Sequence, residues 1–248
     1  MDDKKKKTVV KESYGKVAIG MVDRCCCSEL TNEEVSSYIG YSDEDIKNFS
    51  EANLGLGCGS PTAFGKIDEG AIVLDLGSGA GFDTFLAAQK VGESGKVIGV
   101  DMTEDMIVKA RKNAENYKMK NVEFRLGDIE KLPVDDESID IVISNCVINL
   151  APEKTDVFKE TYRVLKKGGR AYVSDMVLLK ELSPEERSNE VLLCACIGGA
   201  LLKDDYIQKA ESAGFSVKIL GEDTDISQRQ YMGYPIESLK LELRKENS

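Results

Sequence analysis

The chain has 248 residues, of which 42% are apolar, and carries a formal net charge of −11. This length suits one domain with additions, and the apolar fraction is sufficient for a full core. The acidic balance argues against nucleic acid and anionic membrane surfaces as partners, because both recruit proteins through basic patches. The lysine run over residues 4–7 is interpreted as a solvated, frayed terminus.

The chain has seven cysteines and no histidine. It shows no signal peptide after its N-terminal lysines, and no apolar run near the roughly 18 residues of a membrane span. We therefore expect a cytoplasmic protein with no membrane partner. In a reducing compartment, cysteines more often catalyse, bind metals or lie buried than form structural disulfides, and an odd number agrees with that interpretation.

The first 30 residues show a mixed pattern, and Ser42 is expected to cap a short helix. A glycine-rich loop over residues 55–61 contains Cys58, which we expect to be covered by little other structure. Strands are then expected over residues 71–76, 96–100, 122–126, 139–144 and 170–174, and helices over residues 82–91, 105–117 and 157–165. This alternation predicts βαβ units and a parallel sheet.

The last third of the chain departs from this alternation. Residues 177–203 predict a helical insertion, and a helix over residues 204–213 then resumes the pattern. Two final strands are expected over residues 216–220 and 238–243. The second alternates apolar and charged residues, which is typical of an exposed edge strand. The pair Gly168-Gly169 is expected to end the helix that precedes the fifth strand.

A glycine-rich turn directly follows the first expected strand. Its residues, Gly77-Ser78-Gly79-Ala80-Gly81, come after Asp75 and open a helix. Glycines at such a turn let the backbone approach a ligand closely. The GxGxG spacing differs from the GxGxxG of dinucleotide sites, and an acid beside it suits an amino group better than a pyrophosphate. Asp101 and Asp128 follow the next two strands, at the edge where open parallel sheets bind ligands.

This pattern resembles motif I of the class I S-adenosylmethionine-dependent methyltransferases. The resemblance implies that S-adenosylmethionine is the cofactor, with Asp101 on the ribose hydroxyls and the segment around Asp128 near the adenine. A different nucleotide on the same fold, such as NAD, is the alternative. The residues that we expect to bind the cofactor are Asp75, Gly77, Ser78, Gly79, Gly81, Asp101, Met102, Gly127, Asp128, Ile129 and Asn145.

Three cysteines stand alone, each where a loop or helix edge is expected to reach the mouth of the cofactor site: Cys58, Cys146 and Cys196. Cys194 lies two residues before Cys196, so on a helix the two side chains face different directions and only one points easily into the cleft. We interpret Cys194 as a small buried apolar residue. Structural zinc is the rival for these thiols, but its sites usually show CxxC-type pairs, and this chain lacks histidine.

Over residues 10 to about 220, the chain resembles the arsenite S-adenosylmethionine methyltransferases. The segments that carry the resemblance are Tyr14-Gly15, Gly57-Cys58-Gly59, Asp75 to Gly81, Val100 to Thr103, Ser144 to Leu150 and Cys196 to Leu201. It implies an α/β, Rossmann-like methyltransferase sheet, mostly parallel with an antiparallel last strand. Helices are expected on both faces, with an N-terminal arm and a helical insertion after the fifth strand.

The resemblance also implies that trivalent arsenic is held by the catalytic thiols of Cys58, Cys146 and Cys196. One of three N-terminal cysteines would pair with Cys58 in a redox step, and these candidates are Cys25, Cys26 and Cys27. From the residues alone, those three are equally well an incidental exposed cluster. Arsenite and methylarsenite would be the substrates, and a glutathione-like thiol or thioredoxin the reductant.

Arsenic(III) is soft and prefers thiolates, and its lone pair can attack a methyl group without losing a proton, which agrees with the absence of histidine. We divide the chain into residues 1–65 (N-terminal arm and Cys58 loop), 66–176 (cofactor-binding core) and 177–248 (substrate-binding insertion over 177–203 and completion of the sheet). Two other functions stay open. One is a methyltransferase acting on a small carbon or oxygen nucleophile such as a quinone, and the other is a non-catalytic thiol-based metalloid binder.

Overall fold

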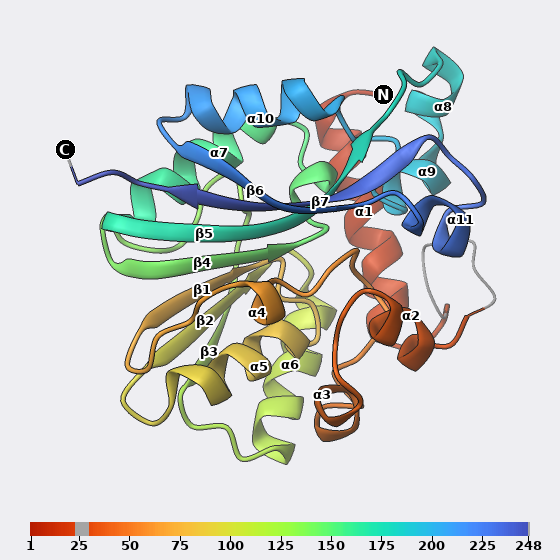
Figure 1. Ribbon diagram of the computed structural model, residues 1–248. Helices are drawn as coiled ribbons and strands as arrows, with labels where there is room; N and C mark the ends of the chain where they lie inside the picture. Colours follow the sequence, from red (N-terminus) through yellow and green to blue (C-terminus); the bar gives the residue numbers. More distant parts are fainter. Residues whose placement is uncertain (23–29, 248) are drawn as a thin grey trace.

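The computed structural model describes residues 1–22 and 30–247. In this part of the chain, seven strands form one sheet with the order β3-β2-β1-β4-β5-β7-β6 (Figure 1). They are β1 (Ile72–Leu76), β2 (Lys96–Asp101), β3 (Val122–Leu126), β4 (Ile139–Asn145), β5 (Leu165–Leu178), β6 (Ser216–Asp223) and β7 (Ile236–Arg244). The first five are parallel, and β7 runs antiparallel to both of its neighbours. The predicted α/β fold is confirmed.

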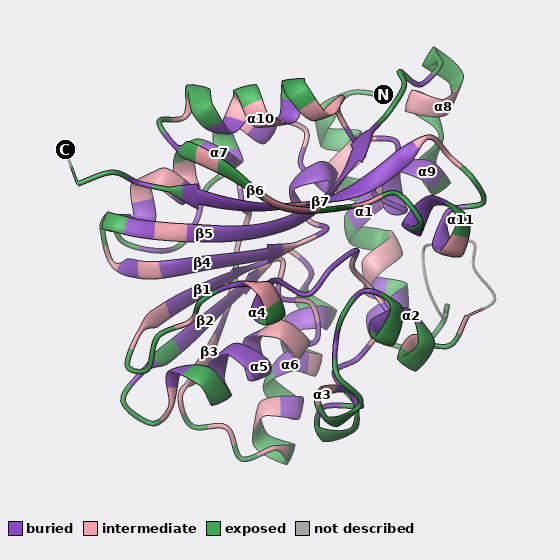
Figure 2. Ribbon diagram, viewed as in Figure 1, coloured by how far each residue is buried: buried purple, intermediate pink, exposed green. Residues whose placement is uncertain are grey.

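Helices cover both faces of the sheet, because successive strand residues point to opposite sides. Val73 packs with α5 (Phe82–Val91) on one face. Leu74 packs on the other face with α7 (Lys154–Val164) and α10 (Lys203–Ser212). Beyond β2, α6 (Glu104–Asn116) packs against β3. Figure 2 shows that the central strands are buried along most of their length, as a parallel sheet between helical layers requires.

The N-terminal residues form a long helix, α1 (Asp3–Ala18), that packs against the domain. Val10 and Val17 lie one heptad apart on its buried face. Lys7 extends from the same helix to Asp128, with 2.5 Å between Nζ and Oδ2. The interpretation of residues 4–7 as a frayed terminus is therefore wrong, since the lysines belong to the first turns of a docked helix.

Three short helices precede the sheet: α2 (Asn32–Tyr38), α3 (Asp43–Asn48) and α4 (Pro61–Phe64). Ser42 caps α3 as expected, accepting a hydrogen bond from the Asp45 amide. The loop between α3 and α4 was expected to be poorly covered, and this expectation is wrong, because Cys58 is only 1% exposed. Its amide donates to Asn145 and its carbonyl accepts from Ser238, so the end of the sheet covers the loop.

The final strand is also placed differently from the expectation. β7 lies between β5 and β6, so the exposed edge is β6 and the prediction of an edge strand over 238–243 is wrong. Leu239 and Leu241 pack in the core, while on the other side Glu242 is buried and pairs with Arg244. Of the charged residues that suggested an edge, Glu242 is buried and paired, Lys240 is half-buried, and Arg244 alone is exposed at the end of the strand.

The glycine pair at 168–169 does not end a helix. The helix α7 stops at Val164, and the chain enters β5 at Leu165 without a loop. Gly168 has φ 74° and donates its amide hydrogen to Lys245. The register of the β4–β5 pairing shifts between Ile139 and Ile141, which indicates a bulge in β5. The two glycines lie within this irregular part of the strand.

The predicted insertion after β5 contains α8 (Pro184–Ser188) and α9 (Glu190–Cys194), and a short helix α11 (Ile226–Gln230) lies between β6 and β7. α9 packs against α1, where the Tyr14 hydroxyl donates to the Cys194 carbonyl at 3.1 Å. Within the described ranges, no helix is long and apolar enough to cross a membrane.

Candidate active site

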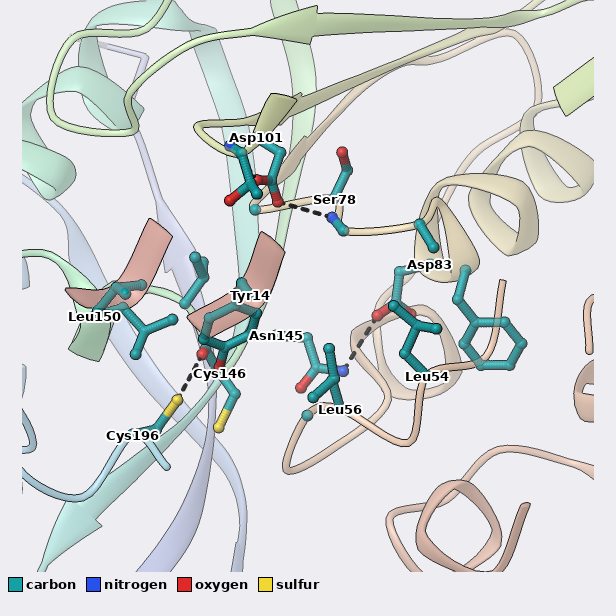
Figure 3. A pocket seen from close by; sticks show the side chains of 18 of the residues that line it. Tyr14, Leu54, Leu56, Ser78, Asp83, Asp101, Asn145, Cys146, Leu150 and Cys196 are labelled. Atoms are coloured by element: carbon teal, nitrogen blue, oxygen red, sulfur yellow. Dashed lines mark hydrogen bonds between the residues drawn. The ribbon is translucent and has the colours of Figure 1, made fainter. Parts of the chain in front are cut away.

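A pocket of about 1320 Å³, measured out to its open mouth, lies at the carboxyl ends of the central strands (Figure 3). α1 forms one wall with Lys7, Val10 and Tyr14. Most of the residues expected to bind the cofactor line this pocket, namely Asp75, Gly77, Ser78, Gly79, Asp101, Met102, Asp128, Ile129 and Asn145. Cys146 and Cys196 also line it, so the structure brings two of the three predicted thiols to the expected cofactor site.

The glycine turn is shaped to admit a polar ligand. Gly77 and Gly79 both have left-handed φ angles, of 64° and 51°. A Cβ on Gly77 would come within 2.3 Å of Val147, whereas a Cβ on Gly79 would meet nothing, so the backbone of Gly79 borders open space. Ser78 Oγ is buried with no protein partner. A cofactor carrying polar groups fits this turn, because Ser78 can then form a hydrogen bond.

Two of the predicted cofactor residues have structural roles instead of lining the pocket. Gly81 is the N-cap of α5 with φ 98°, and a Cβ there would meet the Phe85 ring at 2.7 Å. A Cβ on Gly127 would meet Pro133 at the same distance. Both glycines are needed for close packing beneath the pocket.

The acids around the turn are held in different ways. Asp101 accepts hydrogen bonds from the amides of Gly79 and Thr103, at 3.0 and 2.8 Å. Asp75 is buried and accepts from the Thr84 hydroxyl at 2.6 Å, and burial raises its pKa well above the ordinary value. Asp128 is paired with Lys7 of α1. The proposed adenine end of the pocket is therefore closed by an ion pair that the sequence pattern did not indicate.

Asn145 joins the cofactor pocket to the Cys58 loop. Its Nδ2 donates to Asp83 Oδ2 (Figure 3), and also to Tyr41 Oη and the Gly59 carbonyl. Its Oδ1 accepts from the Cys58 amide. The Tyr41 hydroxyl also donates to Asp83, at 2.7 Å. Burial raises the pKa of Asp83 to about 6, against the lowering effect of these hydrogen bonds. The amide therefore sets the position of a predicted arsenic ligand.

The three predicted thiols converge below this network. Cys58 Sγ, Cys146 Sγ and a carboxylate oxygen of Asp175 all lie within 4.8 Å of one another. Cys196 Sγ donates to the Cys146 carbonyl at 3.0 Å (Figure 3). Cys146 and Cys196 adopt left-handed φ angles of 57° and 64°, which are uncommon for residues other than glycine. Cys58, which does not line the open pocket, lies behind Cys146.

Burial raises the pKa of Cys58, and it raises the pKa of Cys146 further because the neighbouring thiols of Cys196 and Cys58 also disfavour the thiolate. In this buried setting both side chains favour the protonated thiol over the thiolate. The site therefore presents neutral thiols, which the buried setting stabilises.

Asp175 lies beneath the thiols and is 0% exposed. It accepts hydrogen bonds from the amides of Met176 and Asn149, the Asn149 side chain and the Tyr206 hydroxyl. Burial raises the pKa of Asp175 to about 6. The nearby Lys154 is also buried, and burial lowers its pKa to about 8.

Cys194 is buried, as interpreted from the sequence, but it also lines the pocket beside Cys196. The helix α9 ends at Cys194, and the left-handed backbone of Cys196 lies outside it, so helical spacing does not set the relative direction of the two side chains. That only one of them points easily into the cleft stays a prediction. Cys25, Cys26 and Cys27 lie outside the described residues.

Sequence reasoning missed the wall formed by α1, the half-buried Asp83 and the fully buried Asp175. The spacing of Val10, Tyr14 and Val17 was a usable signal for an amphipathic helix. Asp83 follows the glycine motif by two residues, and its position is typical of an ordinary acid in the first turn of a helix. No local signal marks Asp175, since it lies within a strand.

The sheet order, the glycine turn and the acids at the strand ends define a class I S-adenosylmethionine-dependent methyltransferase, and S-adenosylmethionine is its cofactor. Residues 67–214 match the family described as "Methyltransferase domain". This match covers the first five strands, β1 to β5, and ends just after α10.

More specific relatives share nearly the whole chain. It is 44% identical to the arsenite methyltransferase of Halobacterium salinarum, over 98% of this chain and 68% of that protein. It is 40% identical to the arsenite methyltransferase of Mus musculus, over 83% of this chain and 57% of that protein. The crystal structure of an arsenic(III) S-adenosylmethionine methyltransferase from Chlamydomonas reinhardtii matches with a TM-score of 0.65 and 34% identity, covering 86% of this chain and 73% of that one. The chain belongs to the arsenite methyltransferase family.

Proposed function

We propose that this protein transfers methyl groups from S-adenosylmethionine to trivalent arsenic bound by Cys58, Cys146 and Cys196. The observation that carries the proposal is the convergence of these thiols from three distant segments: Cys146 and Cys196 line the cofactor pocket, and Cys58 lies next to Cys146. Soft trivalent arsenic prefers sulfur ligands to oxygen or nitrogen ligands. A methyltransferase acting on carbon or oxygen would have no use for three thiols here.

The raised thiol pKa values suit arsenite as the incoming species. Arsenite is As(OH)₃ at neutral pH, and each As–O bond that is exchanged for an As–S bond transfers one thiol proton to the departing hydroxide, giving water. No proton is released to solvent and no external base is required. The protonated forms of Cys58 and Cys146 therefore carry the protons that this exchange uses.

When bound, S-adenosylmethionine supplies an activated methyl group on a sulfonium sulfur. We assign Asp101 to the ribose hydroxyls, Asp75 to the amino group, and the segment of Asp128 and Ile129 to the adenine. The glycine turn and Ser78 complete the binding surface. Catalysis then rests on holding arsenic beside the methyl group, since well-oriented attack can supply roughly 7–11 kcal/mol.

We assign residues 66–176 to cofactor binding, and residues 1–65 and 177–248 to substrate binding and completion of the fold. Asn145 serves both sites, because one side chain bonds the Cys58 amide and lines the cofactor pocket. Monomethylated arsenic has only two positions left for thiols, so one thiol is released after the first transfer. We propose that Cys58 is that thiol and forms a disulfide with one of Cys25, Cys26 or Cys27, the two electrons and two protons going to the pentavalent methylated arsenic, which returns to the trivalent state. A cytoplasmic glutathione-like thiol or thioredoxin then reduces the disulfide.

The test is one incubation of the purified protein with arsenite, S-adenosylmethionine and a thiol reductant, followed by arsenic speciation. Methylated arsenic that appears with S-adenosylhomocysteine is the expected result. Retention of arsenite without methyl transfer would indicate a metalloid binder instead. Failure to bind arsenite, together with methylation of a quinone, would indicate the carbon or oxygen methyltransferase.

A further inference from the structure

A buried carboxylate lies directly against the thiol site and has no role in the exchange described above. Asp175 is fully buried in β5, and one of its oxygens is within 4.8 Å of both Cys58 Sγ and Cys146 Sγ. A buried carboxylate opposes folding unless other groups stabilise it. A carboxylate buried at this place, beside the proposed arsenic ligands, therefore needs a chemical reason.

The hydrogen bonds of Asp175 limit the chemical roles that its carboxylate can have. Oδ1 accepts from the Met176 amide and the Asn149 side chain, and Oδ2 accepts from the Asn149 amide and the Tyr206 hydroxyl. Two donors on each oxygen occupy the lone-pair sites of an ionised carboxylate. Asp175 therefore has no free lone pair with which to bind arsenic or remove a thiol proton, and what it offers the site is its charge.

The charge is held in place and is not directly neutralised by the neighbouring cation. Lys154 is buried nearby, but its Nζ donates to the carbonyl oxygens of Asn149 and Ala151 at 3.3 and 2.9 Å. The two charges act on each other through the low-dielectric interior. The side of Asp175 that faces the thiols presents a fixed negative charge to whatever the thiols hold.

The methylation step places positive charge at that point. The arsenic lone pair forms the As–C bond while the methyl–sulfur bond breaks, and the electron pair of the broken bond stays on sulfur as a neutral thioether. Arsenic is oxidised from the trivalent to the pentavalent state and acquires the positive charge that the sulfonium loses. No proton moves in this step.

We propose that Asp175 is a preorganised counter-charge that stabilises the cationic arsenic as the methyl group is transferred. The proposal rests on the proposed function and adds a residue to its mechanism. A fixed charge aimed at the place where opposite charge develops lowers a barrier most in a water-excluded site, because it needs no reorganisation during the reaction. Binding of neutral arsenite gains little from the same charge, so the two steps should respond differently to its removal.

The experiment compares wild type with Asp175→Asn in a single turnover, with arsenite bound first and methylated arsenic measured after rapid quenching. We expect the transfer rate to fall about 100-fold, the scale seen when one preorganised electrostatic group is removed from an active site. Arsenite retention on gel filtration and calorimetric binding of S-adenosylmethionine should both stay close to wild type. Tyr206→Phe, assayed at about pH 8, is the matched control: it removes one of the hydrogen bonds that lower the pKa of Asp175, but at this pH the carboxylate stays charged, so its rate should fall far less.

A transfer rate in Asp175→Asn within about threefold of wild type would overturn the proposal, since electrostatic groups in active sites have larger effects. So would loss of arsenite retention in proportion to the rate, which would make Asp175 a structural support for the thiols. If Asp175→Asn does not fold, Lys154→Met tests the same idea. Because Lys154 lowers the pKa of Asp175, its removal should slow the transfer near pH 7 and restore the wild-type rate as the pH rises and Asp175 ionises. A slower rate that does not recover at higher pH, with intact arsenite binding, would refute the counter-charge. Absence of methylation by wild type would instead disprove the proposed function.

Discussion

The cofactor end and the thiol end of this pocket are built on different principles. The cofactor end uses one tight turn and the ends of adjacent parallel strands, so its residues lie within a short stretch from Asp75 to Asp128. The thiol end combines a loop before the sheet, the residue that follows β4 and the second residue after α9. The first is a local consequence of the βαβ pattern, and the second exists only when the whole chain is folded.

The two ends also differ in backbone strain. At the cofactor turn, the left-handed positions are glycines, which adopt them at little cost. At the thiol end, Cys146 and Cys196 adopt left-handed conformations, which cost roughly 1–2 kcal/mol each for residues with a Cβ. The surrounding fold has to hold these residues, and strain of this kind is typical of positions whose side chains must point in one direction.

The largest effect is expected from changing a thiol without touching the cofactor end. Cys146→Ser and Cys196→Ser should each abolish methylation of arsenite, because a hydroxyl is a hard donor that cannot replace a thiol on a soft centre. Calorimetric affinity for S-adenosylmethionine should stay unchanged. Cys194→Ser is the matched control, and it should be much milder. A fully active Cys146→Ser or Cys196→Ser would show that the thiols do not act together.

A second substitution experiment distinguishes the role of Cys58 from that of the other two thiols. Cys58→Ser should stop methylation of arsenite but still allow methylation of monomethylarsenic(III), which offers only two positions for thiols. Parallel assays with the two substrates, each followed by speciation, measure this ratio. Equal loss on both would mean that Cys58 is required throughout the cycle.

The hydrogen-bond network of Asn145, Tyr41 and Asp83 joins the two ends of the pocket. The stability of the protein should depend on pH through the carboxyl group of Asp83. Its pKa is raised from the usual 3.8 to about 6, so the native state holds a proton that the unfolded chain has lost between these values. The free energy of unfolding therefore falls as pH rises through about 4 to 6. Asp83→Asn removes this loss and should stabilise the protein at pH 7.5 by up to about 3 kcal/mol, at 1.36 kcal/mol per pKa unit.

Urea unfolding of both proteins at pH 4.5 and 7.5 provides the measurement. The difference between Asp83→Asn and wild type should shrink at the lower pH, because Asp83 is then protonated in the folded protein. Asparagine can still accept the Tyr41 hydrogen bond. A difference that does not change with pH would mean that Asp83 is not the titrating group.

The smallest effect is expected at the cofactor end itself. Asp101→Ala should weaken binding of S-adenosylmethionine by roughly 1.5–3 kcal/mol, the scale of a lost charged hydrogen bond. Calorimetry measures it, and arsenite retention by the variant serves as the control, because the thiols lie at the other end. Unchanged cofactor affinity would contradict the ribose assignment.

The sequence predicts the cofactor end better than the thiol end, because the cofactor end is local in the chain. The first four strands, the glycine turn and the acids at the strand ends follow from periodicity and spacing, and the structure has them where they were expected. The burial of Cys58 could not be predicted, because it depends on Ser238 and Asn145, which come much later in the chain. β7 carries an alternating pattern that an edge strand would share, and only its pairing on both sides distinguishes it. Asp175 was missed because nothing around it in sequence indicates the four donors that it meets.

The direction of β7 has a practical consequence for attaching probes. Because β7 runs against its neighbours, Arg244 pairs with Arg170 near the start of β5, whereas Ile236 pairs with Leu178 at the end that faces the pocket. The strand has nine residues, so its two ends lie about 26 Å apart at roughly 3.3 Å per residue. A fluorophore, an affinity tag or a surface linkage placed beyond Arg244 would thus project from the rear of the sheet and leave the pocket mouth clear. The same attachment at the start of α1 would sit on the helix that forms the pocket wall.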